Sequence, residues 1–307
     1  MINQQNQYAF DNLELLAKQV VEGFIIGLHK SPFHGFSVEF AEHRIYNEGE
    51  SIKNIDWKVY ARTEKLFVKR FEEETNLRCQ IVIDTSSSMH YPDDAAFLKQ
   101  NKYNKIRFSV VAAAALIHLL KKQRDAFGLS LFNETLEYQS QCKSSTVHQK
   151  LLLTELERQL NTPTLNKKTS SVKALHEIAE AVHKRSLVLL FSDMLDSSES
   201  SDELFQAMQH LKYNKHEVIL FHVIDKKMEL DFEFENRPYL FVDIETGEKL
   251  KLQGNQIKDE YQRRANAFKN ELKMRCTQFN IDFIEADVNE DFRQILLPFF
   301  SKRSKMI

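Results

Sequence analysis

The stretch that decides the fold is Ile81–Met89, which reads IVIDTSSSM. Its apolar residues extend a run that begins at Leu77, and such a run favours a buried strand ending at Asp84. Four small hydroxyl side chains, Thr85–Ser88, follow directly. The stretch therefore predicts a buried strand whose carboxyl end carries one carboxylate and several hydroxyl groups in a tight loop.

Asp84, Ser86 and Ser88 stand at alternate positions of this loop. Hard divalent cations prefer oxygen ligands, and Mg²⁺ takes about six of them at roughly 2.1 Å. Alternate positions in a tight loop can direct one carboxylate and two hydroxyl groups at a single ion. The alternative is a serine-rich turn between a strand and a helix that holds no metal, and the residue types alone leave both interpretations open.

Outward from this stretch, apolar strands and amphipathic helices alternate along the chain. We expect strands near 77–83, 127–132, 187–191, 217–224 and 281–286. We expect helices near 106–120, 147–160, 172–182, 202–211, 256–279 and 292–300. Near-continuous apolar strands separated by helices indicate a mainly parallel sheet covered on both faces. Residues 76–307 are therefore predicted to form an α/β domain with a doubly wound sheet.

Two segments depart from this alternation. Residues 1–75 combine a helical pattern, turn signals at Pro32, Gly35 and Gly49, and short strand-like runs, and we expect a small accessory layer there. Residues 230–252 alternate apolar and polar side chains around a turn signal at Glu245–Gly247, which predicts a β insertion.

The composition bounds the function. The 307 residues include 42 Lys and Arg against 44 Asp and Glu, so a formal charge of −2 gives no reason to expect nucleic acid as a partner. Three scattered cysteines without metal spacing suit a reducing cytoplasm. The first residues lack a signal-peptide pattern, and no apolar run approaches the roughly 18 residues of a membrane span. We expect a soluble, cytoplasmic protein without a membrane span.

Asp193 provides a second carboxylate for the same edge of the sheet. It follows the apolar strand 187–191, and ligands of open α/β sheets bind beyond the carboxyl ends of the strands. The pattern Asp84, Ser86, Ser88 with Asp193 resembles the metal-ion-dependent adhesion site (MIDAS) of von Willebrand factor type A domains. In that family a threonine before a helix completes the site, and the resemblance assigns this position to Thr169. An N-cap role for Thr169 and an ordinary polar strand end at Asp193 are the alternatives.

The type A resemblance implies type A topology and a bound Mg²⁺, with Mn²⁺ or Ca²⁺ as substitutes. Such a site has incomplete coordination, so an Asp or Glu carboxylate of a partner protein can complete it. This chemistry is binding rather than catalysis, and the resemblance therefore implies a non-enzymatic, metal-dependent protein-interaction module.

A second resemblance lies in Tyr46–Glu74, YNEGESIKNIDWKVYARTEKLFVKRFEEE. The Gly-acidic pair, Ile-Asp-Trp, Ala-Arg-Thr and the acidic run are very similar to the hallmark of the domain-of-unknown-function 58 family, whose members carry a type A-like domain. The hallmark more often has Asp at Glu50 and Arg at Lys53, and many relatives carry membrane helices that this chain lacks. The resemblance implies an adaptor or assembly factor working with a MoxR-type AAA+ ATPase and with other type A-domain proteins.

Trp57 of this motif is the only tryptophan, and we expect it to be buried in a structural lock, with a partner-docking surface as the alternative. Basic residues before and within the helix at 106–120 are expected on a solvated face: Lys99, Lys102, Lys105 and Arg107.

Two other functions stay open at this point. One is a structural scaffold whose metal site is vestigial. The other is a Mg²⁺-dependent phosphohydrolase, disfavoured because His90 is the nearest candidate for a general base and no phosphate-binding glycine loop or His-x-x-x-His pair is present.

Overall fold

Strand β3 (Arg78–Asp84) lies inside a six-stranded sheet, as the apolar run predicts. Its companions are β4 (Ala126–Phe132), β5 (Leu136–Gln139), β6 (Leu187–Ser192), β7 (Glu217–Ile224) and β10 (Asp282–Asp287). The strand order is β10-β7-β6-β3-β4-β5, and only the β4–β5 pair is antiparallel. Numbered along the chain this order is 3-2-1-4-5-6, a doubly wound arrangement that reverses direction between β3 and β6. The predicted α/β fold with a mainly parallel sheet is confirmed.

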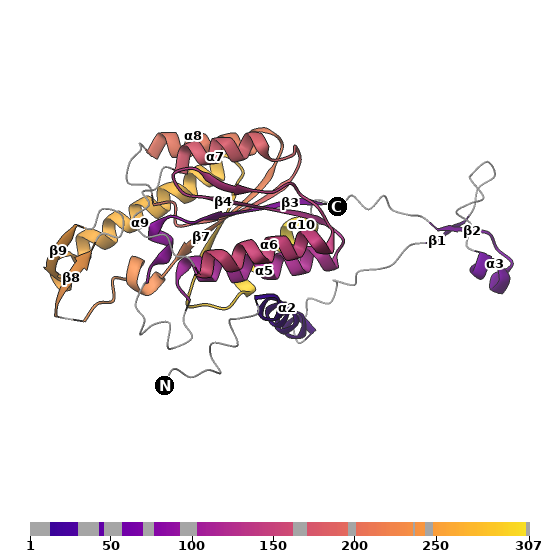
Figure 1. Ribbon diagram of the computed structural model, residues 1–307, viewed down its shortest axis with the longest axis horizontal. Helices are drawn as coiled ribbons and strands as arrows, with labels where there is room; N and C mark the ends of the chain where they lie inside the picture. The colour runs from indigo at the N-terminus through magenta and orange to yellow at the C-terminus, as the bar shows by residue number, and fades with distance from the viewer. Residues whose placement is uncertain are drawn as a thin grey trace. The chain divides into compact units, whose positions relative to one another are not determined.

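The computed structural model describes residues 13–29, 43–45, 57–69, 77–92, 103–161, 171–195, 201–235, 237–242 and 248–304. On one face of the sheet lie α5 (Lys105–Lys122), α6 (Thr146–Asn161), α10 (Arg293–Ser304) and the first part of α2 (Leu13–His29) (Figure 1). On the other face lie α7 (Ser171–Ala181), α8 (Ser201–Tyr213) and α9 (Gly254–Gln278) (Figure 1). The sheet is thus covered on both sides, as its near-continuous apolar strands require.

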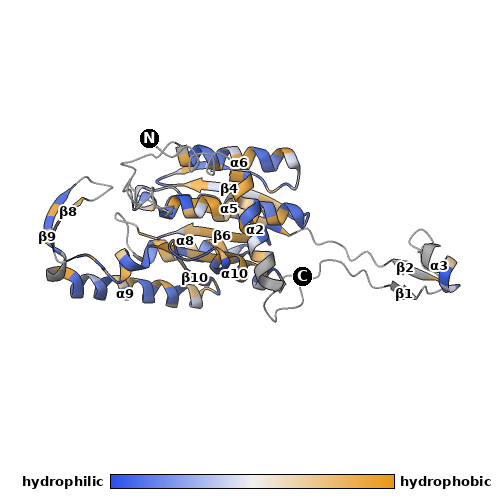
Figure 2. Ribbon diagram, turned by 90° about the horizontal axis from the view of Figure 1, so that it is seen from below, coloured by the Kyte–Doolittle hydropathy of each residue, from blue (hydrophilic) through white to orange (hydrophobic). Residues whose placement is uncertain are grey.

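The core follows the alternation of side chains along the strands. Val82, Val188 and Leu220 face the α7–α8–α9 layer and belong to one buried cluster with side chains of those helices. The neighbouring residues in each strand, such as Ile81 and Phe221, are also fully buried. They point to the opposite helix layer, because successive side chains of a strand alternate between its two faces. The inner strands β6 and β7 are accordingly apolar along most of their length, whereas α9 is largely hydrophilic (Figure 2).

The chain divides into two units, Met1–Phe24 with Leu77–Met306, and Ile25–Asn76 with Ile307. This division differs from the expected one, which placed residues 1–75 together. Leu13, Val21 and Phe24 of α2 are buried, and the Phe24 ring stacks on Phe300 of α10 at a centroid distance of 5.4 Å. The start of α2 belongs to the sheet-containing unit because its apolar side covers a helix of that unit.

The smaller unit contains β1 (His43–Ile45), α3 (Trp57–Thr63) and β2 (Phe67–Lys69), with β1 and β2 antiparallel. Trp57 is 59% exposed and makes an edge-to-face contact with Tyr60 at 6.0 Å. The expected burial of Trp57 is therefore wrong. Residues 46–56 and 70–74 of the hallmark motif lie outside the described residues.

The predicted β insertion is a hairpin of β8 (Pro238–Val242) and β9 (Lys249–Gln253), and the expected turn at 245–247 lies outside the described residues. Phe232 packs against Phe241 of the hairpin and against Tyr261 of α9. This aromatic packing ties the hairpin to the helix that follows it.

Several described elements were not predicted, among them helix α3 of the smaller unit. Strand β5 is short and only half buried, so its pattern is weak. A single π-helical turn, η3 (Lys226–Leu230), follows β7, and such turns occur frequently at functional sites. The described helices include none that combines the length and apolar character of a membrane span.

A candidate cation site at the carboxyl edge of the sheet

Asp84 ends β3, and Asp193 directly follows β6, the parallel neighbour of β3. The chain reverses its winding direction between these two strands. Ligands of open α/β sheets bind at such switch points, outside the carboxyl ends of the strands. The structure therefore brings together the two carboxylates that the sequence predicted for one site.

The Asp84 side chain is completely buried and held at both oxygens. Its Oδ1 accepts the backbone N–H of Ser86 at 2.9 Å, and its Oδ2 accepts the hydroxyl of Ser192 at 2.7 Å. The Ser192 hydroxyl in turn accepts the N–H of Met194 at 2.8 Å. Each carboxylate oxygen has a second lone pair, so Asp84 keeps acceptor capacity for an ion.

The two serine hydroxyls lie together beside Asp84, at the start of the 3₁₀ turn η2 (Ser87–His90). Their Oγ atoms are 3.1 Å apart, and one hydroxyl donates a hydrogen bond to the other. Adjacent ligands of an octahedral ion with bonds of roughly 2.1 Å are separated by about 3.0 Å. Ser86 and Ser88 therefore have the spacing of two neighbouring ligands of one Mg²⁺ ion.

The charge of Asp84 is poorly compensated. Burial, and next the nearby Asp193, raise the pKa of the Asp84 carboxyl to about 7, although hydrogen bonds from Ser192 and Ser86 oppose the rise. Within the described ranges, no ion pair joins Asp84 to a Lys, Arg or His side chain. A buried carboxylate in this setting is stabilised by a cation placed beside it.

Asp193 already has a cation partner, Lys105. The Lys105 Nζ lies 2.7 Å from Asp193 Oδ2 and 2.6 Å from Glu229 Oε1, and the Lys105 side chain is only 1% exposed. Sequence reasoning placed Lys105 on a solvated helix face, and that prediction is wrong. Helix α5 is buried on almost every side, including the face of Lys105 and Ser109.

The Lys105 charge is retained despite burial. Burial alone lowers the pKa of the Lys105 ammonium, but Asp193 and Glu229 outweigh burial and raise the pKa above its ordinary value. Glu229 is held by the π-turn, since its Oε2 accepts the N–H of Asp225 at 2.7 Å. The ammonium therefore bridges the ends of β6 and β7.

The backbone at Asp193 is fixed from the next strand. His222 Nε2 lies 3.1 Å from the Asp193 carbonyl oxygen, and because a carbonyl only accepts, Nε2 carries the proton. Burial lowers the pKa of His222 to about 4, so the ring is neutral near pH 7.

The remaining predicted ligand, Thr169, lies outside the described residues. The described part of the chain contains no group of three or more His, Cys, Asp or Glu side chains that could hold a metal ion. The donor set at this edge is instead two carboxylates with serine hydroxyls, which matches a hard oxygen site and does not match a zinc site.

Sequence reasoning missed Ser192, Lys105 and Glu229. Ser192 could have been found, because it stands in the Ser-Asp pair that ends the apolar strand. Lys105 and Glu229 carry no local signal, since their role depends on an ion pair between the start of α5 and the turn η3.

We expect Ser192→Ala to weaken Mg²⁺ binding about 10-fold, because groups that orient a ligand typically contribute 10- to 100-fold to metal affinity. Calorimetric titration of the metal-stripped variant measures this change. Ser186→Ala is the matched control, since Ser186 is also buried but lies before the opposite end of β6. Equal affinities for wild type and Ser192→Ala would show that Asp84 needs no such support.

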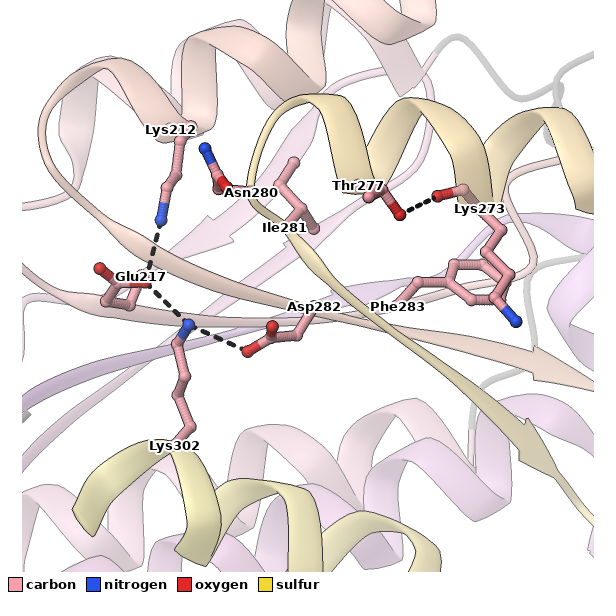
Figure 3. A pocket seen from close by; sticks show the side chains of 9 residues that line it. All are labelled: Lys212, Glu217, Lys273, Thr277, Asn280, Ile281, Asp282, Phe283 and Lys302. Atoms are coloured by element: carbon pink, nitrogen blue, oxygen red, sulfur yellow. Dashed lines mark hydrogen bonds and ion pairs between the residues drawn. The ribbon is translucent and has the colours of Figure 1, made fainter. Parts of the chain in front are cut away.

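A cavity of about 630 Å³ lies at the opposite end of the sheet, near the first residues of β7 and β10 (Figure 3). Lys302 bridges Glu217 at 2.8 Å and Asp282 at 2.9 Å, and Lys212 also contacts Glu217 at 2.9 Å. These charges compensate one another and attach α10 to the sheet. The charged residues that line the cavity are therefore better explained as a structural ion network than as a ligand site.

Residues 42–271 match the family described as protein of unknown function DUF58. The chain belongs to this family. Its described residues contain a doubly wound, mainly parallel sheet covered by helices on both faces.

Among curated proteins, the uncharacterized protein Rv1480 of Mycobacterium tuberculosis (strain ATCC 25618 / H37Rv) is 25% identical over 187 residues. These residues are 61% of this chain and 56% of that protein, and Mb1516 of Mycobacterium bovis matches to the same extent. The chain thus spans little more than half the length of the curated relatives that it matches.

Two solved structures are similar at low identity. BatB from Bacteroides thetaiotaomicron aligns with a TM-score of 0.44 and 13% identity, covering 75% of this chain and 98% of that one. The SpRpn10 VWA domain aligns with a TM-score of 0.32 and 12% identity, covering 48% and 75%. The fold assignment rests on the strand order above rather than on these distant alignments.

Proposed function

We propose that this DUF58 protein is a non-enzymatic interaction module that captures a carboxylate of a partner protein through a divalent cation. The observation that supports it most is the arrangement of Asp84, Ser86 and Ser88: a buried carboxylate with acceptor capacity lies next to two hydroxyl oxygens 3.1 Å apart.

Asp84, Ser86 and Ser88 would hold the ion directly, and Asp193 would contact it through a water molecule from the end of β6. Thr169, before helix α7, is the proposed further ligand on the strength of the type A resemblance. Mg²⁺ is the preferred ion because every proposed ligand is a hard oxygen, with Mn²⁺ or Ca²⁺ as substitutes. When bound, the ion would supply positive charge and a coordination position for the incoming carboxylate.

The partner is proposed from family resemblance. The family resemblance implies an adaptor or assembly factor that works with a MoxR-type AAA+ ATPase and with other type A-domain proteins. We propose the same role here. We place the module in the cytoplasm, because the cysteines Cys79, Cys142 and Cys276 are free thiols.

The test is capture of a purified MoxR-type AAA+ ATPase by the immobilised protein. Capture is expected in Mg²⁺, and we expect it to fall at least 10-fold in EDTA or with Asp84→Ala. Glu180→Ala is the matched control, since it removes an exposed carboxylate from α7. Full capture by Asp84→Ala in EDTA would exclude a metal bridge.

A second candidate is a scaffold that works without metal, and Lys105 is the observation that favours it. The ammonium already compensates Asp193 and Glu229 from within the protein. This candidate predicts that capture of the same ATPase is unchanged by EDTA and depends on another surface, such as exposed Trp57 and Tyr60.

A further inference from the structure

Lys105 is placed against the preferences of both a helix and a protein interior. It is the first residue of α5, where the helix dipole disfavours a cation, and its side chain is buried. Asn104 satisfies the helix end separately by accepting the N–H of Arg107 at 2.9 Å, so the capping of α5 does not require Lys105. Buried ion pairs are often replaceable by apolar side chains without loss of stability. A charge kept at such a position indicates a role beyond holding the fold.

The contacts of Lys105 restrict what Asp193 can do. One Asp193 oxygen lies 2.7 Å from the ammonium, and the other accepts the N–H of Leu195 at 3.1 Å. A divalent ion bound directly to Asp193 would share a carboxylate with a fixed positive charge, and the two cations would repel. Contact through a water molecule places the ion farther from the ammonium.

The side-chain charges at this edge of the sheet add up to the opposite of the charge of one divalent ion. Asp84, Asp193 and Glu229 contribute three negative charges when ionised, and Lys105 contributes one positive charge, which leaves −2. One divalent ion brings the edge to neutrality, and a partner carboxylate then approaches a neutral site. Without the ammonium, the same carboxylate would approach a site that is still negative.

We propose that Lys105, held by Glu229, is a positioning residue that keeps Asp193 from binding the ion directly. Its positive charge lowers the affinity of the site for the metal ion and favours binding of a partner carboxylate to the bound ion. This inference rests on the proposed function, since it concerns the same ion site.

The test compares the Mn²⁺ affinities of variants of the 307-residue chain after bound metal has been removed. Electron paramagnetic resonance measures the free Mn²⁺ that remains at each added concentration. Lys105→Met is expected to bind Mn²⁺ at least about 10-fold more tightly, because one repulsive charge near the ion is lost. Glu229→Gln is expected to bind about 10-fold more weakly, because an attractive charge is lost. Lys105→Arg keeps the charge and should stay within about threefold of wild type.

A matched control is Lys122→Met, at the far end of the same helix and about 25 Å away along its axis. It removes the same charge and should leave the Mn²⁺ affinity unchanged.

A second measurement uses acetate as the carboxylate probe and follows water-proton relaxation by the bound Mn²⁺. Acetate should displace bound water from wild type at a lower concentration than from Lys105→Met.

If Lys105→Met does not fold, Lys105→Gln takes its place, because it also removes the charge and keeps a polar side chain. Tighter Mn²⁺ binding by the variant that lacks the Lys105 charge supports the proposal, and weaker binding by Glu229→Gln shows that the charges of this edge act on the same ion. If wild type binds Mn²⁺ through Asp84 and both variants bind it equally well, the role of Lys105 is wrong and the proposed function stands. If wild type shows no Mn²⁺ binding that Asp84→Ala removes, both are overturned.

Discussion

Replacing Asp84 by asparagine is expected to stabilise the metal-stripped protein at pH 8 and to remove its response to Mg²⁺. The folded-state pKa of Asp84 is raised from 3.8 to about 7, chiefly by burial and then by Asp193. Because the folded protein holds the Asp84 proton more tightly than the unfolded chain does, the protonated carboxyl contributes its full stability below about pH 4. This contribution to the free energy of unfolding is lost as the pH rises through about 7. At pH 8 this loss is on the order of 2–4 kcal/mol, and Asn, which cannot ionise, avoids it.

The measurement is urea unfolding of both proteins in EDTA at pH 5 and pH 8. The advantage of Asp84→Asn should be large at pH 8 and much smaller at pH 5. Mg²⁺ at about 100 times its dissociation constant should stabilise wild type by about 2.7 kcal/mol and leave Asp84→Asn unchanged. A variant less stable than wild type at pH 8 would show that Asp84 is not a poorly compensated carboxylate.

The second large effect concerns helix α2. Phe24→Ala is expected to lower the unfolding free energy by about 3 kcal/mol, because it removes a buried ring that stacks on Phe300. Thermal unfolding of the full chain measures the change. The reason is that the start of α2 is part of the core of the sheet-containing unit.

Leu15→Ala is the control for this prediction, since Leu15 lies on the same helix and is 51% exposed. Its effect should stay below about 1 kcal/mol. Equal, small effects of the two substitutions would mean that α2 is dispensable for the sheet-containing unit, as the division at residue 75 implies.

The sheet could be predicted because its strands are buried on both faces. Such strands have continuous apolar runs, and the run at Ile81–Ile83 with the one at Leu187–Phe191 identified the two central strands. Asp84 and Asp193 follow these runs directly, and the geometry of parallel strands brings their ends to one edge. Local patterns therefore place both carboxylates at one edge of the sheet, whereas the strand order shows that β3 and β6 are neighbours there.

The surroundings of these carboxylates could not be predicted in the same way. Lys105 stands among other basic residues, and its burial depends on Glu229, 124 positions later in the chain. The exposure of Trp57 was also missed, because a large aromatic residue predicts burial only as a tendency. A contact between residues far apart in sequence decides the burial of Lys105.

A cation site at Asp84 is tested most directly by calorimetric titration of Mg²⁺ into EDTA-stripped protein, with wild type beside Asp84→Ala. We expect one binding site in wild type and its loss in Asp84→Ala, with both proteins folded by circular dichroism. Absence of Mg²⁺ binding to wild type, or equal binding to both proteins, would contradict a cation site at Asp84, Ser86 and Ser88.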